Sequence, residues 1–298
     1  MAKNNEDFYV MGYPTKVFRH QVQSGLKPKD NIKNIIAIGS GKGGVGKSTL
    51  SVNVAVALAQ MGLNVGLLDA DIYGPSQPVM LGLNHKPEVK NNKFIPLHHH
   101  GVSMMSMGCL VEKQTPMIWR GPMVSGALLQ LLNETHWQAH APELDVLIID
   151  LPPGTGDIQL TMAQKIPLSG ALVITTPQDI ALIDAQKAIA MFNKVSVPVL
   201  GVIENMSVHV CEQCGHQERI FGEGGAQRLA QEYEVPVLGH IPLVSQIRIQ
   251  SDKGIPIVES HPQSEQAKIF KEIAKKMMTN LGLRPRDYGL STPVVTNN

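Results

Sequence analysis

A glycine-rich stretch, GSGKGGVGKST at residues 39–49, constrains the fold of this 298-residue chain more than any other feature. It follows an apolar run, IKNIIAIGS, and precedes a segment whose apolar residues recur at helical spacing up to about Met61. The pattern Gly41-x4-Gly46-Lys47-Ser48 is typical of a phosphate-binding loop, which connects a strand to a helix. The sequence therefore predicts a phosphate site at residues 39–49.

The residue types in this loop suit a polyphosphate ligand. Glycines let backbone N–H groups turn toward a phosphate without Cβ clashes, and the following helix N-terminus adds its dipole. We expect Lys47 to neutralise the β- and γ-phosphates and Ser48 to supply a hydroxyl to Mg²⁺. The alternative is a plain glycine-rich turn, which the flanking strand and helix disfavour. The predicted nucleotide-binding residues of this stretch are Gly41, Lys42, Gly43, Gly44, Val45, Gly46, Lys47, Ser48 and Thr49.

Short apolar runs alternate with helical patterns along the rest of the chain. The apolar runs include NVGLLDAD, GVSMMSMG, LDVLIIDLP, GALVITTP, PVLGVIENM and PVLGHIP. This alternation predicts an α/β fold, a mostly parallel sheet with helices on both faces. We expect a polar N-terminal extension at 1–31, one domain at 32–283 and a polar tail at 284–298.

The amino-acid composition indicates which kinds of partner the protein can have and in which cellular compartment it works. The formal net charge is +1 and aromatic residues make up 4%, so the sequence does not favour nucleic acid as a partner. No run reaches the roughly 18 consecutive apolar residues of a membrane span, and the N-terminus lacks an apolar signal-peptide core. Three cysteines fit no disulfide framework and indicate a reducing compartment. We expect a cytoplasmic protein.

Two later segments carry carboxylates at predicted strand ends. LLDADIYGPS places Asp69 and Asp71 there, and VLIIDLPPGTGD places Asp150. A carboxylate at this edge can hold Mg²⁺ through water or orient an attacking water. A turn or capping role is the alternative for the first two, and a structural role for the third. Gly154 could approach a γ-phosphate through its backbone N–H, so DLPPGTGD is a candidate switch II.

A Cys-x-x-Cys pair, Cys211 and Cys214, lies in VHVCEQCGHQ. Such thiolates can bind one metal ion or adjacent irons of one cluster. A [4Fe–4S] cluster or a tetrahedral zinc usually takes four ligands, so a two-fold dimer would complete the set. A structural zinc using His209 or His216 stays open, and a redox-active dithiol is less favoured.

Lys42 is not required by the phosphate-loop pattern. KGGVGKS resembles the deviant Walker A loop of the MinD, ParA, ArsA and nitrogenase iron-protein group of ATPases, in which the extra lysine reaches the partner subunit's nucleotide. The resemblance implies a deviant Walker A P-loop NTPase that binds ATP and Mg²⁺, with Lys42 acting catalytically across a homodimer. It further implies that Asp71 positions the attacking water. The resemblance also implies that Ser48, Asp69 and Asp150 bind Mg²⁺ and that Asn205 contacts the adenine edge. A solvated loop lysine is the alternative for Lys42.

The motifs together resemble the Mrp/ApbC family of iron–sulfur cluster carrier ATPases. They are KGGVGKS, DADIYGPS, DLPPGTGD, the Cys-x-x-Cys after ENMS, GEGG and HIPLVSQIR, spread over about residues 32–280. The resemblance implies an ATP-hydrolysing homodimer that carries a labile [4Fe–4S] cluster bridging the two subunits through Cys211 and Cys214. Its implied partners are a cluster-assembly scaffold and apo iron–sulfur proteins. Many members have a small extra domain before the P-loop domain; residues 1–31 leave no room for it, and we expect it to be absent.

Two other functions remain as alternatives. One is a MinD/ParA-like positioning ATPase with a structural zinc at the cysteines, which would need a membrane- or DNA-binding surface. The basic helix near 263–281 could supply it, but we favour a final helix packed on the sheet and no stable membrane binding. The other is a GTPase metallochaperone, which the absence of a Lys-x-Asp after Asn205 disfavours.

Three further features are not assigned to the site. The triplet His98, His99 and His100 is expected in a solvated loop rather than at a metal. Cys109 is expected to be a buried structural thiol. Trp119 and Arg120 lie, by resemblance, near the switch and dimer region.

Overall fold

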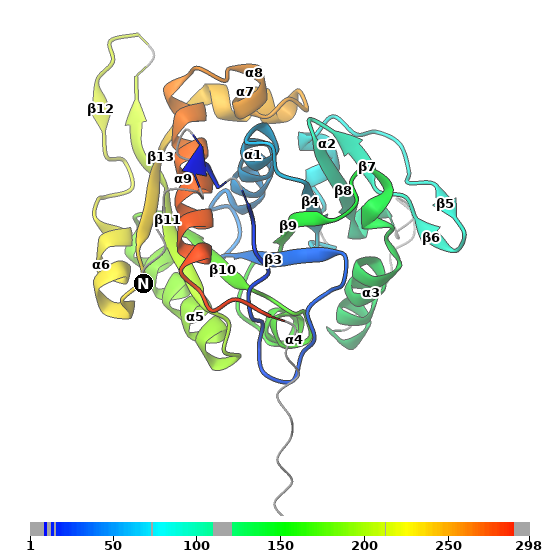
Figure 1. The fold of residues 1–298 in the computed structure, drawn as a ribbon. Coiled ribbons are helices and arrows are strands. Elements are labelled where there is room, and N and C mark those ends of the chain that lie inside the picture. Colours follow the sequence, from blue (N-terminus) through cyan, green and yellow to red (C-terminus); the bar gives the residue numbers. More distant parts are fainter. Residues whose placement is uncertain are drawn as a thin grey trace, which may run out of the picture.

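The computed structural model describes residues 9–10, 13–14, 16–72, 74–109, 121–211 and 213–288. Trp119 and Arg120 lie outside the described residues. Within them, the chain forms a nine-stranded sheet in the order β12-β11-β10-β3-β9-β4-β8-β7, with β13 paired to β11 (Figure 1). All neighbouring strands are parallel except the antiparallel edge pairs β7–β8 and β11–β12.

The strands of this sheet are β3 (Ile32–Gly39), β4 (Val65–Asp69), β7 (Leu97–His99), β8 (Val102–Ser106), β9 (Leu144–Asp150), β10 (Gly170–Thr175), β11 (Val199–Val210), β12 (Gln217–Glu218) and β13 (Val237–Leu243). Two small hairpins lie apart from it, formed by β1 (Tyr9–Val10) with β2 (Tyr13–Pro14) and by β5 (Val89–Lys90) with β6 (Lys93–Phe94).

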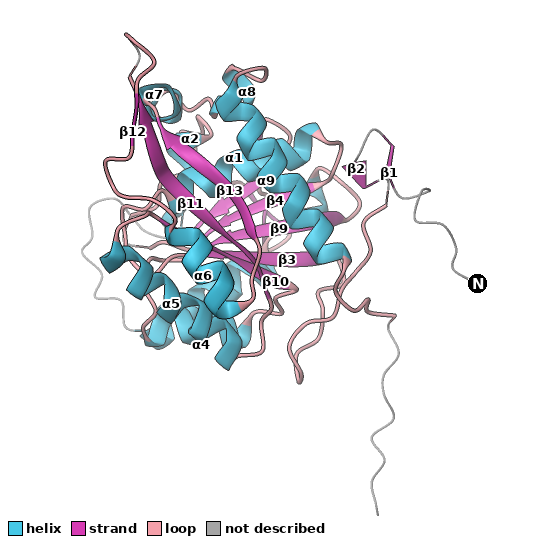
Figure 2. Cartoon of the chain, turned by 90° about the vertical axis from the view of Figure 1, so that its left-hand side faces the viewer, coloured by secondary structure: helices cyan, strands magenta, loops and turns pink. Residues whose placement is uncertain are grey.

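Helices cover both faces of the sheet (Figures 1 and 2). One face carries α1 (Lys47–Gln60), α2 (Gln77–Met80), α7 (Ser245–Asp252), α8 (Ile257–Ser260) and α9 (Glu265–Gly282). The other carries α3 (Gly121–Glu134), α4 (Asp157–Lys165), α5 (Asp179–Lys194) and α6 (Gly225–Tyr233). Single 3₁₀ turns lie at Met107–Cys109 and Trp137–Ala139. The predicted α/β class, with a mostly parallel sheet and helices on both faces, is confirmed.

The central strand β3 shows why the strands read as continuous apolar runs. Ile36 and Ile38 belong to the core beneath α1 and α9, whereas Ile35 and Ala37 belong to the core beneath the opposite helices. Successive side chains of a strand point to opposite faces, so a strand covered on both sides must be apolar at every position. The same burial on both faces extends through β4, β8, β9 and β10.

The last helix packs on the sheet, as we expected. The Ser264 hydroxyl accepts a hydrogen bond from the Ala267 N–H at 3.1 Å and caps the start of α9. Phe270, Ile273 and Met277 are buried in the core shared with α1 and β13. The apolar stripe of α9 is therefore covered by the domain itself. None of the described helices is long and apolar enough to cross a membrane.

The expectation of a loop at the histidine triplet was wrong for two of its members. His98 and His99 lie in β7, which pairs with β8 at the end of the sheet, and both are exposed. Because consecutive side chains of a strand point to opposite faces, the exposure of both histidines means that neither face of this edge strand is covered there. His100 follows in a turn with φ of +49°.

Candidate nucleotide and thiol site

Three neighbouring parallel strands bring the phosphate loop and two carboxylates to one edge of the sheet. β3 runs directly into the loop, β9 ends at Asp150, and β4 ends at Asp69. In the sheet register, Ile38 lies opposite Asp150, which in turn lies opposite Asp69. The carboxyl ends of parallel strands are where ligands bind in open α/β sheets.

Asp150 is the centre of a hydrogen-bond cluster in which Lys47, Ser51 and Gln77 are buried and Ser48 is half-buried. Its Oδ1 lies 2.7 Å from Lys47 Nζ and accepts the Ser51 hydroxyl at 2.8 Å. Its Oδ2 accepts the Ser48 hydroxyl at 2.7 Å and Gln77 Nε2 at 2.9 Å. The structure thus brings the predicted Lys47, Ser48 and Asp150 into direct contact.

Sequence reasoning missed two members of this cluster. Ser51 lies four residues after Lys47 on α1, so its helical spacing placed it on the same face and could have revealed it. Gln77, on α2, also donates to the Ser48 carbonyl at 3.0 Å and so ties α2 to the loop. The sequence carries no pattern that places Gln77 there.

Asp69 organises the segment that follows β4. Its carboxylate accepts backbone N–H groups of Asp71, Ser76 and Gln77 at 3.1–3.2 Å and the Ser106 hydroxyl at 3.2 Å. Burial, together with the nearby charge of Asp150, raises the pKa of Asp69 to about 7. Asp69 is therefore a buried carboxylate that fixes the segment 71–77 and does not itself line the pocket over the loop.

A pocket of about 290 Å³ opens over the loop. Its lining includes Asp71, which precedes α2, and Pro153, which follows β9. Of the predicted loop residues it contains Lys42, Gly43, Gly44, Gly46, Lys47, Ser48 and Thr49. A more apolar pocket of about 200 Å³ adjoins it and includes Asn205, while Gly46, Thr49, Met80 and Met206 line both.

The remaining predicted residues support the loop from behind. A Cβ on Gly41 would lie 2.1 Å from the backbone of Asp184, so only glycine fits between the loop and α5. Val45 is buried, and its carbonyl accepts Asn205 Nδ2 at 2.8 Å. Because this bond uses the amide nitrogen, Asn205 keeps Oδ1 as an acceptor for a ligand.

Lys42 lines the pocket, whereas Gly154 directly follows Pro153 of the lining. The Gly154 N–H donates to the Ser40 carbonyl at 2.9 Å, with φ of +103° at the glycine. A phosphate would have to replace that carbonyl before the predicted N–H contact could form. Lys42 is half-buried, and its carbonyl accepts the Ser40 hydroxyl at 2.9 Å.

The two cysteines lie at the tip of a hairpin that prolongs β11 beyond the sheet. The Cys211 N–H donates to the His216 carbonyl at 2.9 Å, and the Gly215 N–H donates to the Cys211 carbonyl at 2.8 Å. Cys214 is exposed and Cys211 is half-buried. Among the described residues, no group of three or more His, Cys, Asp or Glu side chains is placed to hold a metal ion. One chain therefore offers two thiols there, with room for further ligands from outside.

Cys109 differs from this pair. It ends the 3₁₀ turn after β8 and is half-buried rather than fully buried. Burial raises the pKa of its thiol, so it is a poorer nucleophile and metal ligand.

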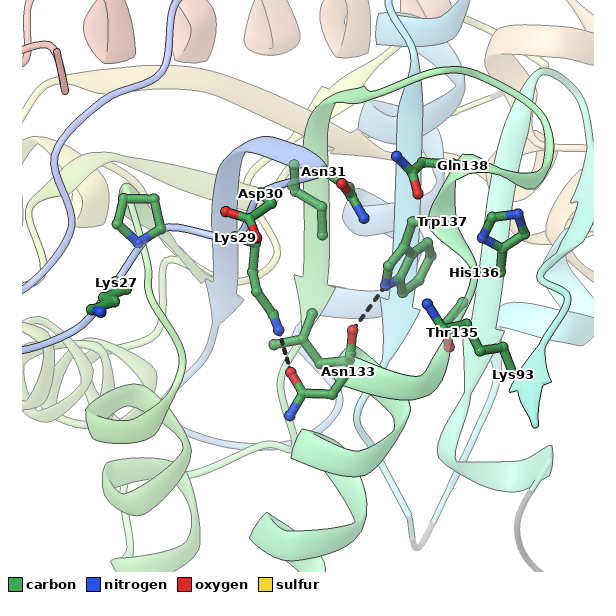
Figure 3. Close-up of a pocket in the computed structure, with 13 residues that line it drawn as sticks. Lys27, Lys29, Asp30, Asn31, Lys93, Asn133, Thr135, His136, Trp137 and Gln138 are labelled. Carbon is green, nitrogen blue, oxygen red and sulfur yellow. Dashed lines mark hydrogen bonds between the residues drawn. The ribbon is translucent and has the colours of Figure 1, made fainter. Parts of the chain in front are cut away.

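A separate pocket of about 350 Å³ lies where β3 begins, at the opposite end of the sheet from the loop (Figure 3). Lys29 Nζ donates to the side chain of Asn133 at the end of α3, and Trp137 Nε1 donates to the Leu132 carbonyl at 3.1 Å. A cation at a helix C-terminus stabilises the helix dipole. These contacts give Lys29 a structural role at the end of α3.

The strand–loop–helix arrangement, with an aspartate of the neighbouring strand against the loop lysine and serine, defines a P-loop NTPase. A family model described as ParA, NUBPL iron-transfer P-loop NTPase, matches residues 31–278. The chain belongs to this family.

Relatives in three organisms agree with this assignment. An iron-sulfur cluster carrier protein of Pseudomonas fragi is 55% identical over 86% of this chain and 88% of its own length. One of Escherichia coli K12 is 55% identical over 85% of this chain and 68% of its own length. The iron-sulfur cluster transfer protein NUBPL of Mus musculus is 49% identical over 87% of this chain and 81% of its own length.

Solved structures support the fold. A nucleotide-binding protein of Archaeoglobus fulgidus in complex with ADP superposes with a TM-score of 0.69 and 36% identity, over 81% of this chain and 93% of that one. The cell division ATPase MinD of Pyrococcus furiosus gives a TM-score of 0.64 at 24% identity, over 83% and 98% of the two chains, and shows the fold alone.

Proposed function

We propose that this protein is an ATP-hydrolysing homodimer that binds a labile [4Fe–4S] cluster and transfers it to apo iron–sulfur proteins. The observation that carries the proposal is the joint presence of a formed phosphate pocket and an exposed hairpin with two thiols, half of a cluster's usual ligand set. The names of the relatives, cluster carrier and cluster transfer proteins, support the same conclusion.

The residues around the pocket fit a magnesium nucleotide. Bound Mg²⁺ would neutralise phosphate charge and help hold the phosphates in line for attack. Ser48 and Asp150 supply the hydroxyl and carboxylate oxygens that Mg²⁺ prefers, with Asp69 behind them. Lys47 would leave its ion pair with Asp150 and bind the β- and γ-phosphates instead.

The remaining roles concern the attacking water and the partner subunit. Asp71 lines the pocket and is our candidate for positioning water, and Gly154 is the candidate γ-phosphate contact of switch II. Asn205 would read the adenine edge from the adjoining apolar pocket. Lys42 would reach the partner's phosphates, where a cation stabilises the charge of the transition state.

The dimer follows from the ligand count as well as from Lys42. Cys211 and Cys214 would bind the cluster as thiolates, and the same pair of a second copy would complete four ligands about a two-fold axis. The proposed partners are therefore a second copy of this chain, a cluster-assembly scaffold that loads it, and apo iron–sulfur proteins that unload it in the cytoplasm.

Anaerobic reconstitution with iron and sulfide tests the proposal. We expect about four irons and four sulfides per two chains in the wild type, with a dimeric mass. The variant Cys211→Ser/Cys214→Ser should lose them, whereas Cys109→Ser should keep them. Bound zinc without sulfide would instead support a dimerising ATPase with a structural zinc, and a cluster retained by the double variant would contradict the assigned ligands.

A further inference from the structure

One strand connects the phosphate loop with the cysteine hairpin. Asn205, on β11, donates to the Val45 carbonyl inside the loop at 2.8 Å, and Cys211 follows directly after the end of the same strand. With a rise of about 3.3 Å per residue, these two positions lie at most roughly 20 Å apart along the chain. A displacement of Asn205 therefore has a short covalent route to the thiols.

Met206, the next residue, interrupts this strand. Its φ of +55° is in the left-handed region, where the Cβ of an L-residue comes too close to the following carbonyl oxygen. The register with β13 shifts at the same place, because Asn205 lies opposite Ile241 while His209 lies opposite Leu243. Strained residues and bulges persist where the surroundings hold them, and they gather at functional and switching regions.

The strand is held differently on the two sides of Met206. Up to Glu204 it is buried and paired with both β10 and β13. Beyond Met206 the pairing with β10 has ended, and the hairpin pairs with β12. The pairing with β13 continues at His209, and two side chains add to it: the Ser207 hydroxyl donates to the Ile241 carbonyl, and His209 Nδ1 donates to the Leu243 carbonyl, both at 3.2 Å.

The joint between these two regions faces the ligand pockets. Met206 lines both the pocket over the phosphate loop and the adjoining apolar pocket, and Asn205 lines the latter. A nucleotide that fills them would contact the residues at which the rigid part of β11 ends. Interactions that differ between two positions of the hairpin would then shift its equilibrium.

We propose that Asn205 and Met206 are positioning residues that couple nucleotide binding to the orientation of the Cys211–Cys214 hairpin, with the Met206 bulge as the hinge. The inference rests on the proposed function, since it takes the bound ligand to be a nucleotide and the thiols to be the carrier site. It assigns the coupling to the backbone of β11.

The test uses the full chain without a cluster. The rate at which iodoacetamide alkylates each cysteine is measured by peptide mass spectrometry. The three conditions are no nucleotide, Mg-ADP and a non-hydrolysable Mg-ATP analogue. Calorimetry sets the nucleotide concentrations that saturate the protein. We expect saturating nucleotide to change the alkylation rate of Cys214 by about fivefold or more, the lower range of allosteric coupling. Cys109 of the same molecule serves as the internal reference.

Three variants separate the hinge from other effects. Met206→Gly accepts a positive φ without a Cβ penalty, so it should loosen the hinge and bring the response at Cys214 close to onefold. Met206→Ala removes the side chain but keeps a strained L-residue, so it should retain the response. Met80→Ala, which alters the same two pockets from α2, should retain it too. All proteins are compared at one concentration, and their mass in solution is measured in each nucleotide state, so that a change caused by subunit association is recognised.

Two results would overturn the inference: a wild type that binds nucleotide with unchanged rates at both hairpin cysteines, or a Met206→Gly variant that responds like the wild type. Either result leaves the reconstitution experiment unaffected, so a protein that takes up a cluster without a nucleotide response keeps the proposed function and loses the coupling. A protein that takes up no cluster but shows a clear nucleotide response at Cys214 keeps the coupling and loses the proposed function.

Discussion

Lys47 and Asp150 form an ion pair of 2.7 Å with side-chain exposures of 6% and 0%, in the middle of the phosphate site. A buried charge is tolerated only when it is paired and hydrogen-bonded, and removal of one partner leaves the other uncompensated. The pair therefore links the stability of the domain to the chemistry of the loop.

Replacing the carboxylate of this pair should destabilise the whole domain. We expect Asp150→Ala to lower the free energy of unfolding in urea by about 3–5 kcal/mol, because Lys47 is left charged and buried. Asp252→Ala removes a carboxylate from an exposed pair with Arg248 and should cost less than about 1 kcal/mol. Equal losses in the two variants would contradict this account.

Asp69 should make the stability of the ligand-free protein depend on pH. The pKa of this carboxyl is raised from 3.8 to about 7 in the folded state, so the folded protein binds more protons than the unfolded chain between these values. The contribution of Asp69 is thus full below pH 4 and is lost as the pH rises through about 7. Urea unfolding at several pH values should show a flatter dependence for Asp69→Asn than for wild type.

Two loop glycines offer a matched pair of substitutions. Gly44 and Gly46 have φ of +80° and +89°, but only a Cβ at Gly46 would collide, lying 2.1 Å from Asn205 Nδ2. Gly44→Ala should cost about 1–2 kcal/mol from backbone strain alone. Gly46→Ala should cost roughly 2–4 kcal/mol and weaken nucleotide binding, because it also displaces Asn205. Calorimetry with ADP and urea unfolding would check both, and similar effects at the two positions would exclude the steric explanation.

Lys42 should act on hydrolysis rather than on binding. For Lys42→Ala we expect a loss of ATP hydrolysis on the order of 10³-fold, comparable to removal of a cation from a phosphoryl-transfer site, with ADP affinity changed little. Mixing Lys42→Ala with Lys47→Ala should restore part of the activity, because one of the two sites in each mixed dimer combines Lys47 of its own subunit with Lys42 of the partner. No recovery on mixing would place Lys42 in its own subunit's site.

The sequence predicted the sheet, the covering helices and the position of the loop because these depend on local patterns. Apolar runs of strand length and the glycine spacing of residues 39–49 are visible without tertiary contacts. The final helix was also foreseeable, since its apolar residues recur on one side.

Other features depend on contacts between distant residues. The bond from Gln77 to Asp150 joins segments 73 positions apart, and nothing in either segment indicates it. Met206 reads as an ordinary strand residue, since methionine has no preference for a positive φ. The strand at His98 and His99 was missed because its pairing with β8 requires the turn at His100, whose φ of +49° is uncommon for a non-glycine residue.

The register of β9 has a consequence for how such a site can vary. Ile38, Asp150 and Asp69 lie side by side across β3, β9 and β4, so the heights of both carboxylates are set by sheet pairing rather than by loops. Side chains alternate between the two faces of a strand, and a slip by one residue would turn Asp150 away from Lys47. Changes in loops outside residues 47–51 and 71–77 can therefore accumulate without moving the carboxylates, whereas a single deletion between residues 144 and 149 would turn Asp150 away from the loop.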